Sequence, residues 1–394
     1  MPLDIEGVQQ ALAADGLDGW LLYDFHGSNP IAVRLADLEH SQKMTTRRWF
    51  YLIPRTGSPQ ALVHAIERHN LDHLPGRKSA YAGRESLEQG LKALLEGTRT
   101  VAMEFSARAN IPYVSRVDAG TVDLIREFGV DVVSSGDLVQ RFEARWNSYH
   151  LMMHRLASER LYRVKNKAFE EIGRRLTDGT PTTEYDVQQL VARWMADEGL
   201  KTDSPPCCSA QENSANPHYS PTSQHHRPIG RDEVVLLDLW GKMAQPGTVY
   251  ADITWMGYTG PVVPDEVRQA FAAVCAGRDA AVALVEAAAR TQGELRGWQV
   301  DRAAREAIEA LGYGAYILHR TGHSLGQEVH GNGVHMDDYE THDDRRLLPG
   351  TGFTVEPGVY LPSFGVRTEI NLYMSDHDVS VSGPMQDEVV ALLA

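Results

Sequence analysis

Acidic side chains inside strand-like runs constrain the fold of this chain more than any other feature. Each of four such acids lies within a mostly apolar run in the second half of the chain. They are Asp238 in the run 234–240, Asp252 in 249–256, Glu356 in 352–361 and Glu369 in 366–374. Burying a carboxylate costs free energy unless the group is paired. A turn hydrogen bond or a salt bridge would explain one such acid, but four in one region indicate a site.

A turn signal separates the first two of these runs. Gln245-Pro246-Gly247 lies between them, so the runs are predicted to pair as a hairpin centred near Gln245. That register places Asp238 and Asp252 opposite each other on one face of the sheet. Opposed carboxylates repel unless a cation lies between them, so the hairpin favours a cation-binding site.

Histidines gather in a glycine-containing segment downstream. His319, His323 and His330 lie in the segment 319–330, whose two inner glycines permit close approach of the backbone. A single histidine is more often a packed or surface residue than a ligand, but three in such a segment favour a site. Another histidine, His218, follows a proline that marks a turn.

One histidine with four carboxylates makes an oxygen-rich ligand set. Such sets suit Mn²⁺, Mg²⁺ or Fe²⁺ better than the thiolate sites that select zinc. Five ligands, some of them bridging, suffice for two metal ions about 3.5–4 Å apart. Two such ions would supply hydroxide at neutral pH and polarise a carbonyl, which is the chemistry of amide hydrolysis.

The order of the secondary-structure patterns predicts two domains. Helical and strand-like segments alternate up to about residue 135, which is typical of a compact α/β domain, and no catalytic signature appears there. A helical region follows, in which Thr183 with Asp186 fits an N-cap. Strand pairs and two long helices then indicate an α+β domain. We place the two domains at 1–150 and 151–394.

The charge balance and the cysteine count restrict partners and compartment. The 394-residue chain has 38 Lys and Arg against 53 Asp and Glu, a formal net charge of −15. This disfavours nucleic acid or an anionic membrane as the main partner, since both are polyanions. No apolar run reaches the length of a membrane span, the N-terminus lacks a signal-peptide pattern, and three cysteines cannot form a disulfide framework. We therefore expect a cytoplasmic protein.

These segments resemble, in order along the chain, the metal-ligand motifs of the pita-bread metallopeptidases of family M24. The motifs are Asp238, Asp252-Ile253-Thr254, Thr321-Gly322-His323 with His330, Val355-Glu356-Pro357-Gly358 and Gly365-Val366-Arg367-Thr368-Glu369. They are most similar to those of the Xaa-Pro peptidases, aminopeptidase P and prolidase. The resemblance implies an α+β pita-bread (creatinase/aminopeptidase-like) domain at the C-terminus, preceded by a smaller creatinase-like α/β domain.

The resemblance implies five metal ligands. Asp238 would bind one metal ion, and Asp252 and Glu369 would bridge both ions. His323 and Glu356 would hold the other ion. The implied cofactor is two divalent metal ions per subunit, with Mn²⁺ as the expected metal and Zn²⁺ or Co²⁺ as alternatives.

The resemblance also implies residues that act on the substrate. His218 would contact the substrate and stabilise the tetrahedral intermediate, and His330 would bind the substrate near its proline. Glu356, besides being a ligand, would shuttle a proton as a catalytic residue. His319 would lie in the pocket wall or behind it, and Arg367 would lie beside the metals or bind a substrate carboxylate.

The implied function is hydrolysis of the peptide bond before proline through a metal-bridging hydroxide. Substrates would be proline-containing dipeptides or oligopeptides, and the family implies a homodimer. The hairpin departs from the family pattern, because Trp240 stands where glycine is typical and about three extra residues precede Asp252. Dipeptidase and aminopeptidase activity therefore both stay open. Two other interpretations are a non-peptidase metal-dependent hydrolase or lyase on this scaffold and a non-catalytic binding module.

Overall fold

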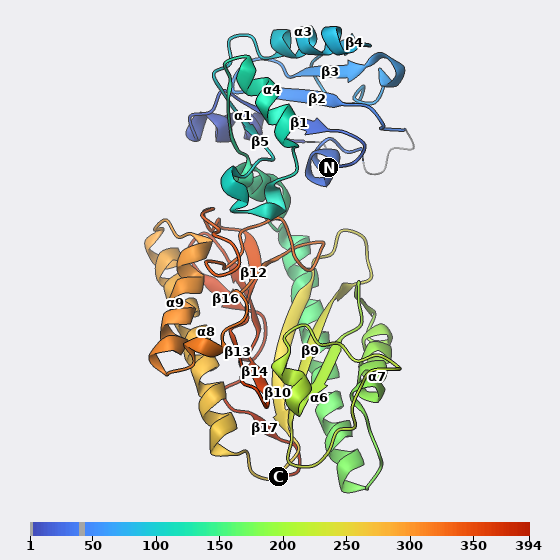
Figure 1. Cartoon of the computed structure of the whole chain (residues 1–394), viewed down its shortest axis with the longest axis vertical. Coiled ribbons are helices and arrows are strands. Elements are labelled where there is room, and N and C mark those ends of the chain that lie inside the picture. The colour runs from blue at the N-terminus through green and yellow to red at the C-terminus, as the bar shows by residue number, and fades with distance from the viewer. Residues whose placement is uncertain (1–2, 39–43) are drawn as a thin grey trace. The chain divides into compact units, whose positions relative to one another are not determined.

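The computed structural model describes residues 3–38 and 44–394. It divides into two compact units, Met1–Glu143 and Ala144–Ala394, which are described separately (Figure 1). The division into domains 1–150 and 151–394 stays a prediction. No helix in these described ranges is both long and apolar enough to cross a lipid bilayer.

The first unit is a six-stranded mixed sheet with helices on both faces. Its strands run in the order β4-β3-β2-β1-β5-β6. The strands are β1 Gly19–Asp24, β2 Trp49–Pro54, β3 Gln60–His64, β4 Arg77–Tyr81, β5 Thr100–Met103 and β6 Asp131–Ser134, and the helices are α1 Ile5–Ala14, α2 Pro30–Leu35, α3 Arg84–Leu94, α4 Ala119–Glu127 and α5 Gly136–Val139. Alternate side chains of β1 point to opposite faces. Trp20 and Leu22 therefore pack with α1 and α2, while Leu21 and Tyr23 pack with α3 and α4.

The second unit holds three sheets between two layers of helices. One sheet has the order β17-β10-β9-β7, with β8 also paired to β9, the second has the order β11-β12-β15-β16, and β13 pairs with β14. The strands are β7 Leu200–Lys201, β8 Cys207–Ala210, β9 Val234–Met243, β10 Ala251–Tyr258, β11 Ser324–Leu325, β12 Thr351–Val355, β13 Gly358–Tyr360, β14 Gly365–Arg367, β15 Ile370–Met374, β16 Val379–Val381 and β17 Val390–Ala391. The helices are α6 Ser148–Thr177, α7 Glu184–Asp197, α8 Asp265–Thr291 and α9 Gly297–Ala310.

Each layer of helices covers one of the two larger sheets. The apolar stripes of α6 and α7 pack on β9 and β10, and those of α8 and α9 pack on β12 and β15. Figure 1 shows the strands lying between these two helical layers. On the other face of the first sheet, Val234 and Leu236 pack against the first turns of α8, and Asp238, farther along β9, is partly exposed beyond this apolar contact.

Two expectations about the strands were wrong. The hairpin pairs Asp252 with Trp240 and Thr254 with Asp238, so the two aspartates are diagonal neighbours rather than opposite residues. The centre of the turn lies one residue later than predicted. Since a shift of the turn by one residue changes the strand register by two, Asp252 lies opposite Trp240 and not opposite Asp238. The segments 352–361 and 366–374, each predicted as one strand, are each two strands in different sheets.

A buried histidine of α6, which contacts the residue just before β10, predicts acid sensitivity of the second unit. His154 is fully buried, its Nδ1 lies 2.8 Å from the Tyr250 carbonyl oxygen, and its Nε2 lies 2.9 Å from Ser382 Oγ. Burial lowers the pKa of His154 from 6.5 to about 4. The unfolded chain therefore binds this proton first, so stability is complete above about pH 6.5 and falls as the pH approaches 4.

This sensitivity is measured by urea denaturation at pH 7 and pH 4.5. His154 should contribute up to about 3 kcal/mol of the difference in the free energy of unfolding. His154→Leu should be less stable at pH 7 and should show a smaller loss between the two pH values. An unchanged pH dependence in this variant would show that His154 is not the titrating group.

Candidate metal centre

The hairpin places two acids on one face of its sheet. On β9 the residues Asp238, Trp240 and Lys242 are partly exposed, whereas the residues between them are buried against α6 and α7. Asp252 is the cross-strand partner of Trp240, so it projects from the same face as Asp238. Asp252 itself is buried, with 5% of its surface exposed.

An exchange of strand partners presents the other two acids. Val355 pairs with Ile370 in one sheet, and Gly358 pairs with Arg367 in the separate ribbon. Glu356 and Glu369 lie in the gap between these pairs, where both strands pass from one sheet to the other. Pro357 has no backbone N–H to continue the ladder, which accounts for the break. The Glu369 N–H instead donates to the Thr254 carbonyl on β10 (3.3 Å).

The histidine ligand candidate is fixed by a close backbone approach. The His323 N–H donates to Thr354 Oγ1 (2.9 Å), so the loop lies against β12. A Cβ at Gly322 would lie 2.1 Å from the Thr354 carbonyl oxygen, so only glycine fits there. Of the two inner glycines of this segment, Gly322 is thus required for the placement of His323, whereas a Cβ at Gly326 would make only ordinary contacts, the nearest at 3.6 Å.

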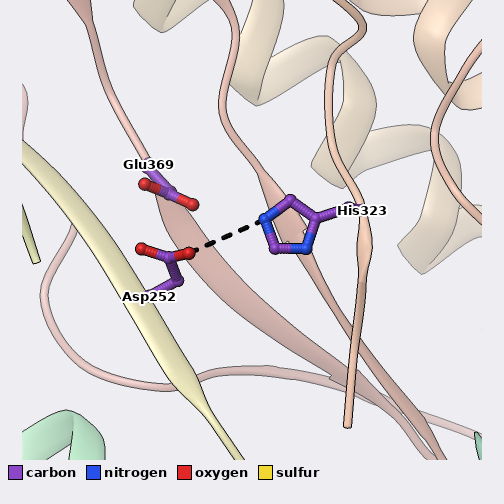
Figure 2. Close-up of side chains that lie close together, drawn as sticks. All are labelled: Asp252, His323 and Glu369. Atoms are coloured by element: carbon purple, nitrogen blue, oxygen red, sulfur yellow. Dashed lines mark ion pairs between the residues drawn. The ribbon is translucent and has the colours of Figure 1, made fainter. Parts of the chain in front are cut away.

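Asp252, His323 and Glu369 converge on one point. Ligand atoms of the three residues lie within 4.8 Å of one another, and all three residues are buried. Figure 2 shows the two carboxylates and the imidazole facing one another, with His323 Nε2 3.6 Å from Asp252 Oδ2. Asp252 Oδ1 and Glu369 Oε1 are buried without a hydrogen-bond partner among the described residues. Unpaired buried carboxylate oxygens are costly, and a divalent cation would satisfy them.

The electrostatics of the cluster also fit a cation. Burial raises the pKa of Asp252 well above its usual range, and the charge of Asp238 adds to the rise. Burial likewise raises the pKa of Glu369, with Asp252 as the next cause. Burial lowers the pKa of His323, so the imidazole is neutral and able to act as a ligand. A divalent cation would reverse the carboxyl shifts by stabilising the ionised forms.

The remaining two ligand candidates contact the cluster through other residues. Glu356 Oε1 lies 3.3 Å from His323 Nε2 and accepts a hydrogen bond from Thr354 Oγ1 (3.1 Å). Burial opposes ionisation of Glu356, but the attraction of His323 and His319 gives a net lowering of its pKa. Asp238 Oδ2 accepts a hydrogen bond from Arg367 Nη2 (2.5 Å), and Arg367 is buried.

Arg367 belongs to a chain of hydrogen bonds that the sequence analysis did not identify. Its Nε donates to Thr254 Oγ1 (3.0 Å), and Thr254 Oγ1 donates to Glu369 Oε2 (2.8 Å). Its Nη1 donates to Tyr360 Oη (3.3 Å). Thr254 could have been identified from the sequence, because it is a polar residue two positions after Asp252 on the same face of the strand. Nothing local in the sequence indicates that Tyr360 takes part.

The three other histidines take different positions. His319 is half-buried, with Nδ1 2.7 Å from the Arg320 carbonyl oxygen and Nε2 2.7 Å from Tyr360 Oη. His330 is exposed, and its ring lies edge-on to that of His323 with the two ring centroids 4.4 Å apart. His218 is exposed, and its side chain makes no hydrogen bond or ion pair with the described residues.

The sheets and helical layers of the second unit define the class as a pita-bread fold, and a group of buried acids and one histidine that could hold a metal ion lies where the strands exchange partners. Residues 157–376 match the family model described as metallopeptidase family M24. The chain belongs to metallopeptidase family M24.

Individual relatives agree with this assignment. An Xaa-Pro dipeptidase of Lactobacillus helveticus is 31% identical over 202 residues, which are 51% of this chain and 49% of the relative. The chain spans about half the length of the curated relatives it matches.

Two solved structures show the same fold. The dipeptidase PepE of Mycobacterium ulcerans aligns over 100% of both chains, with a TM-score of 0.68 and 21% identity. An X-prolyl aminopeptidase of Caenorhabditis elegans, described as a cytosolic enzyme with a di-nuclear active site, has a TM-score of 0.64 and 16% identity over 96% of this chain and 60% of that one.

Proposed function

We propose that this protein hydrolyses the peptide bond before proline in dipeptides or short peptides, using two divalent metal ions. The observation that carries the proposal is the buried group Asp252, His323 and Glu369, in which two carboxylate oxygens have no partner among the described residues. Relatives that bear the names Xaa-Pro dipeptidase and X-prolyl aminopeptidase support the choice of substrate.

Five residues would hold the metal ions. Asp252 and Glu369 would bridge them, Asp238 would bind one, and His323 and Glu356 would bind the other. Mn²⁺ is the proposed metal, because hard carboxylate oxygens dominate the set, with Zn²⁺ or Co²⁺ as substitutes. The chemistry that such ions supply when bound is polarisation of a carbonyl and a strong nucleophile from water at neutral pH.

The chain's own side chains would position the substrate and move protons. Glu356, for which burial is outweighed by the attraction of neighbours that include Arg367 and Arg320 so that its pKa is lowered, would carry a proton to the leaving imino nitrogen. His330, beside His323, would donate a hydrogen bond to the oxygen that gains charge, and His218 would add a second donor from its exposed loop. Each such donor would be worth about 3 kcal/mol in the transition state.

Arg367, Tyr360 and His319 would keep the acids in place. Because Arg367 donates to Tyr360 Oη, the tyrosine hydroxyl can donate to His319 Nε2, and His319 Nδ1–H then donates to the Arg320 carbonyl. Arg367 would thus hold Asp238 rather than a substrate carboxylate. We further propose a cytoplasmic homodimer, in line with the family resemblance, with no nucleic acid or membrane as partner.

The test is hydrolysis of Ala-Pro and of Ala-Pro-Ala by Mn²⁺-loaded protein, with a chelator as the blank. We expect cleavage before proline that the chelator abolishes and Mn²⁺ restores. Cleavage of the dipeptide alone would indicate a dipeptidase, and cleavage of the tripeptide an aminopeptidase. If metal binds but neither peptide is cleaved, the proposal is wrong, and a non-peptidase hydrolase or lyase on this scaffold would take its place.

A further inference from the structure

An aromatic side chain stands next to the metal centre on the exposed side of the hairpin. Trp240 is the cross-strand partner of Asp252, and it follows Asp238 by two residues on the same face of β9. Antiparallel partners on one face lie about 4.5–5.5 Å apart, so the indole is within reach of anything bound at the cluster. Trp240 is only half-buried, whereas Trp20 and Trp49 of the first unit are 0% and 2% exposed.

Contacts on two sides fix the indole. Its Nε1 donates to Asp203 Oδ1 (2.9 Å), and Trp240 and Val329 both pack against the small apolar cluster that contains Tyr250 and Leu325. The residue after Val329 is His330, whose ring contacts His323. A side chain held at its edge and its base cannot swing aside when a ligand arrives. The helices α6 and α7 cover the other face of β9, so the strand that carries Trp240 is also held in place. The indole therefore forms a fixed wall, meaning a surface that limits the space beside the metal-ligand candidates.

Asp203 offers a charge beside this wall. It is exposed, and its Oδ1 accepts from the indole and from Ser204 Oγ (3.1 Å). Its Oδ2 accepts no hydrogen bond from the described residues, so one carboxylate oxygen next to Trp240 stays open to an incoming donor. Every unblocked dipeptide carries an α-ammonium group at its first residue. This group can donate a charge-assisted hydrogen bond to the open carboxylate oxygen of Asp203.

We propose that Trp240 and Asp203 form the site for the first residue of the substrate. This inference rests on the function proposed above. Asp203 pairs with the α-ammonium group, and the indole limits the adjacent side chain, so the protein prefers peptides that begin with a small residue such as glycine or alanine. Proline is the same in every substrate, so a wall at the first residue acts on the part that varies.

The experiment compares kcat/KM for Phe-Pro and Ala-Pro in the Mn²⁺-loaded protein and its variants. Trp240→Ala should raise the ratio of kcat/KM for Phe-Pro to kcat/KM for Ala-Pro by about tenfold or more. This is the change in specificity that one extra methylene group in a pocket typically causes. Trp240→Phe, which keeps an aromatic ring in the strand, should give an intermediate ratio. Trp194→Ala is the matched control, because Trp194 is a half-buried tryptophan on α7, on the opposite side of β9 from the cluster.

Asp203→Asn tests the ammonium contact separately. The asparagine keeps an oxygen acceptor for the indole N–H and removes only the charge. We expect KM for Ala-Pro to rise about fivefold with kcat retained, the size of an exposed ion pair. Metal content, measured for each variant, should equal that of the wild type.

The outcomes separate this inference from the proposed function. Wild-type protein that cleaves neither dipeptide overturns both. Cleavage with an equal loss for both peptides in Trp240→Ala and Trp240→Phe overturns the wall alone, and would assign the indole to the proline ring or to folding. An unchanged KM in Asp203→Asn overturns the ammonium contact.

Discussion

Asp252→Asn is expected to abolish metal binding and peptidase activity while making the metal-free protein more stable. The substitution keeps the shape of the side chain but removes a buried charge whose Oδ1 has no partner among the described residues. Loss of a residue that only supports a metal ligand lowers metal affinity about 10- to 100-fold, and the loss of a ligand itself should lower it by more. The free energy of unfolding of the chelated protein should rise, because an unpaired buried carboxylate is costly.

Metal content after dialysis against Mn²⁺ and urea denaturation in chelator measure these two effects. The matched control is Glu104→Gln in the first unit, another fully buried carboxylate. Its oxygens accept from Trp20 Nε1 (2.8 Å), Asn29 Nδ2 (2.7 Å) and Ser135 Oγ (3.0 Å). In Glu104→Gln the side-chain NH2 group would face one of these three hydrogen-bond donors. This variant should therefore lose stability and keep its metal. Full Mn²⁺ retention by Asp252→Asn would refute the assignment of the cluster.

Glu184→Ala is expected to cause a large loss of stability of the second unit. Glu184, the first residue of α7, is fully buried, and its carboxylate gathers the loop that carries His218. It accepts from the N–H groups of Ala210 (2.7 Å) and Arg227 (2.9 Å) and from Tyr219 Oη (2.5 Å). Asn213 Nδ2 donates to both oxygens, at 3.1 and 3.0 Å. Truncation leaves several buried donors unpaired, which should cost more than about 3 kcal/mol.

Urea denaturation of the full chain tests this expectation. Glu212→Ala serves as the control, since Glu212 lies on the same loop but is exposed, and its one ion pair within residues 3–38 and 44–394 is with Arg227 (3.3 Å). That variant should change the free energy of unfolding by less than about 1 kcal/mol. Hydrogen exchange of the residues 210–228 should accelerate in Glu184→Ala and stay unchanged in the control. Similar stability of the two variants would show that the buried carboxylate does not organise the loop.

The sequence was sufficient for local features and for the identity of candidate ligands. Thr183 caps α7 with Asp186 as predicted, because capping depends on residues three apart. The acids at 238, 252, 356 and 369 stand out because apolar neighbours predict strands, and strands rarely bury charge. The assignment of those acids as metal ligands stays a prediction.

The sequence was insufficient where one part of the chain meets another. The register of the β9–β10 hairpin depends on how the turn residues fold, and the predicted centre was one residue early. The two strand breaks, at Glu356-Pro357 and at Thr368-Glu369, were missed because apolar residues flank each break on both sides. Pro357, which has no backbone N–H to donate to a ladder, was a local signal for the first break. Glu184 reads as an ordinary first-turn acid, and only the tertiary fold shows that the backbone of a distant loop surrounds it.

The exchange of strand partners at Glu356 and Glu369 makes the centre depend on both of the larger sheets of the second unit. Asp252 comes from one sheet, Glu369 directly precedes β15 of another, and His323 comes from a loop between them in the sequence. No two of these residues are near neighbours in the chain, so their ligand atoms meet only after both sheets have formed and joined. A nascent or truncated chain that lacks β15 cannot assemble the group, and bound metal would therefore report a fully folded second unit.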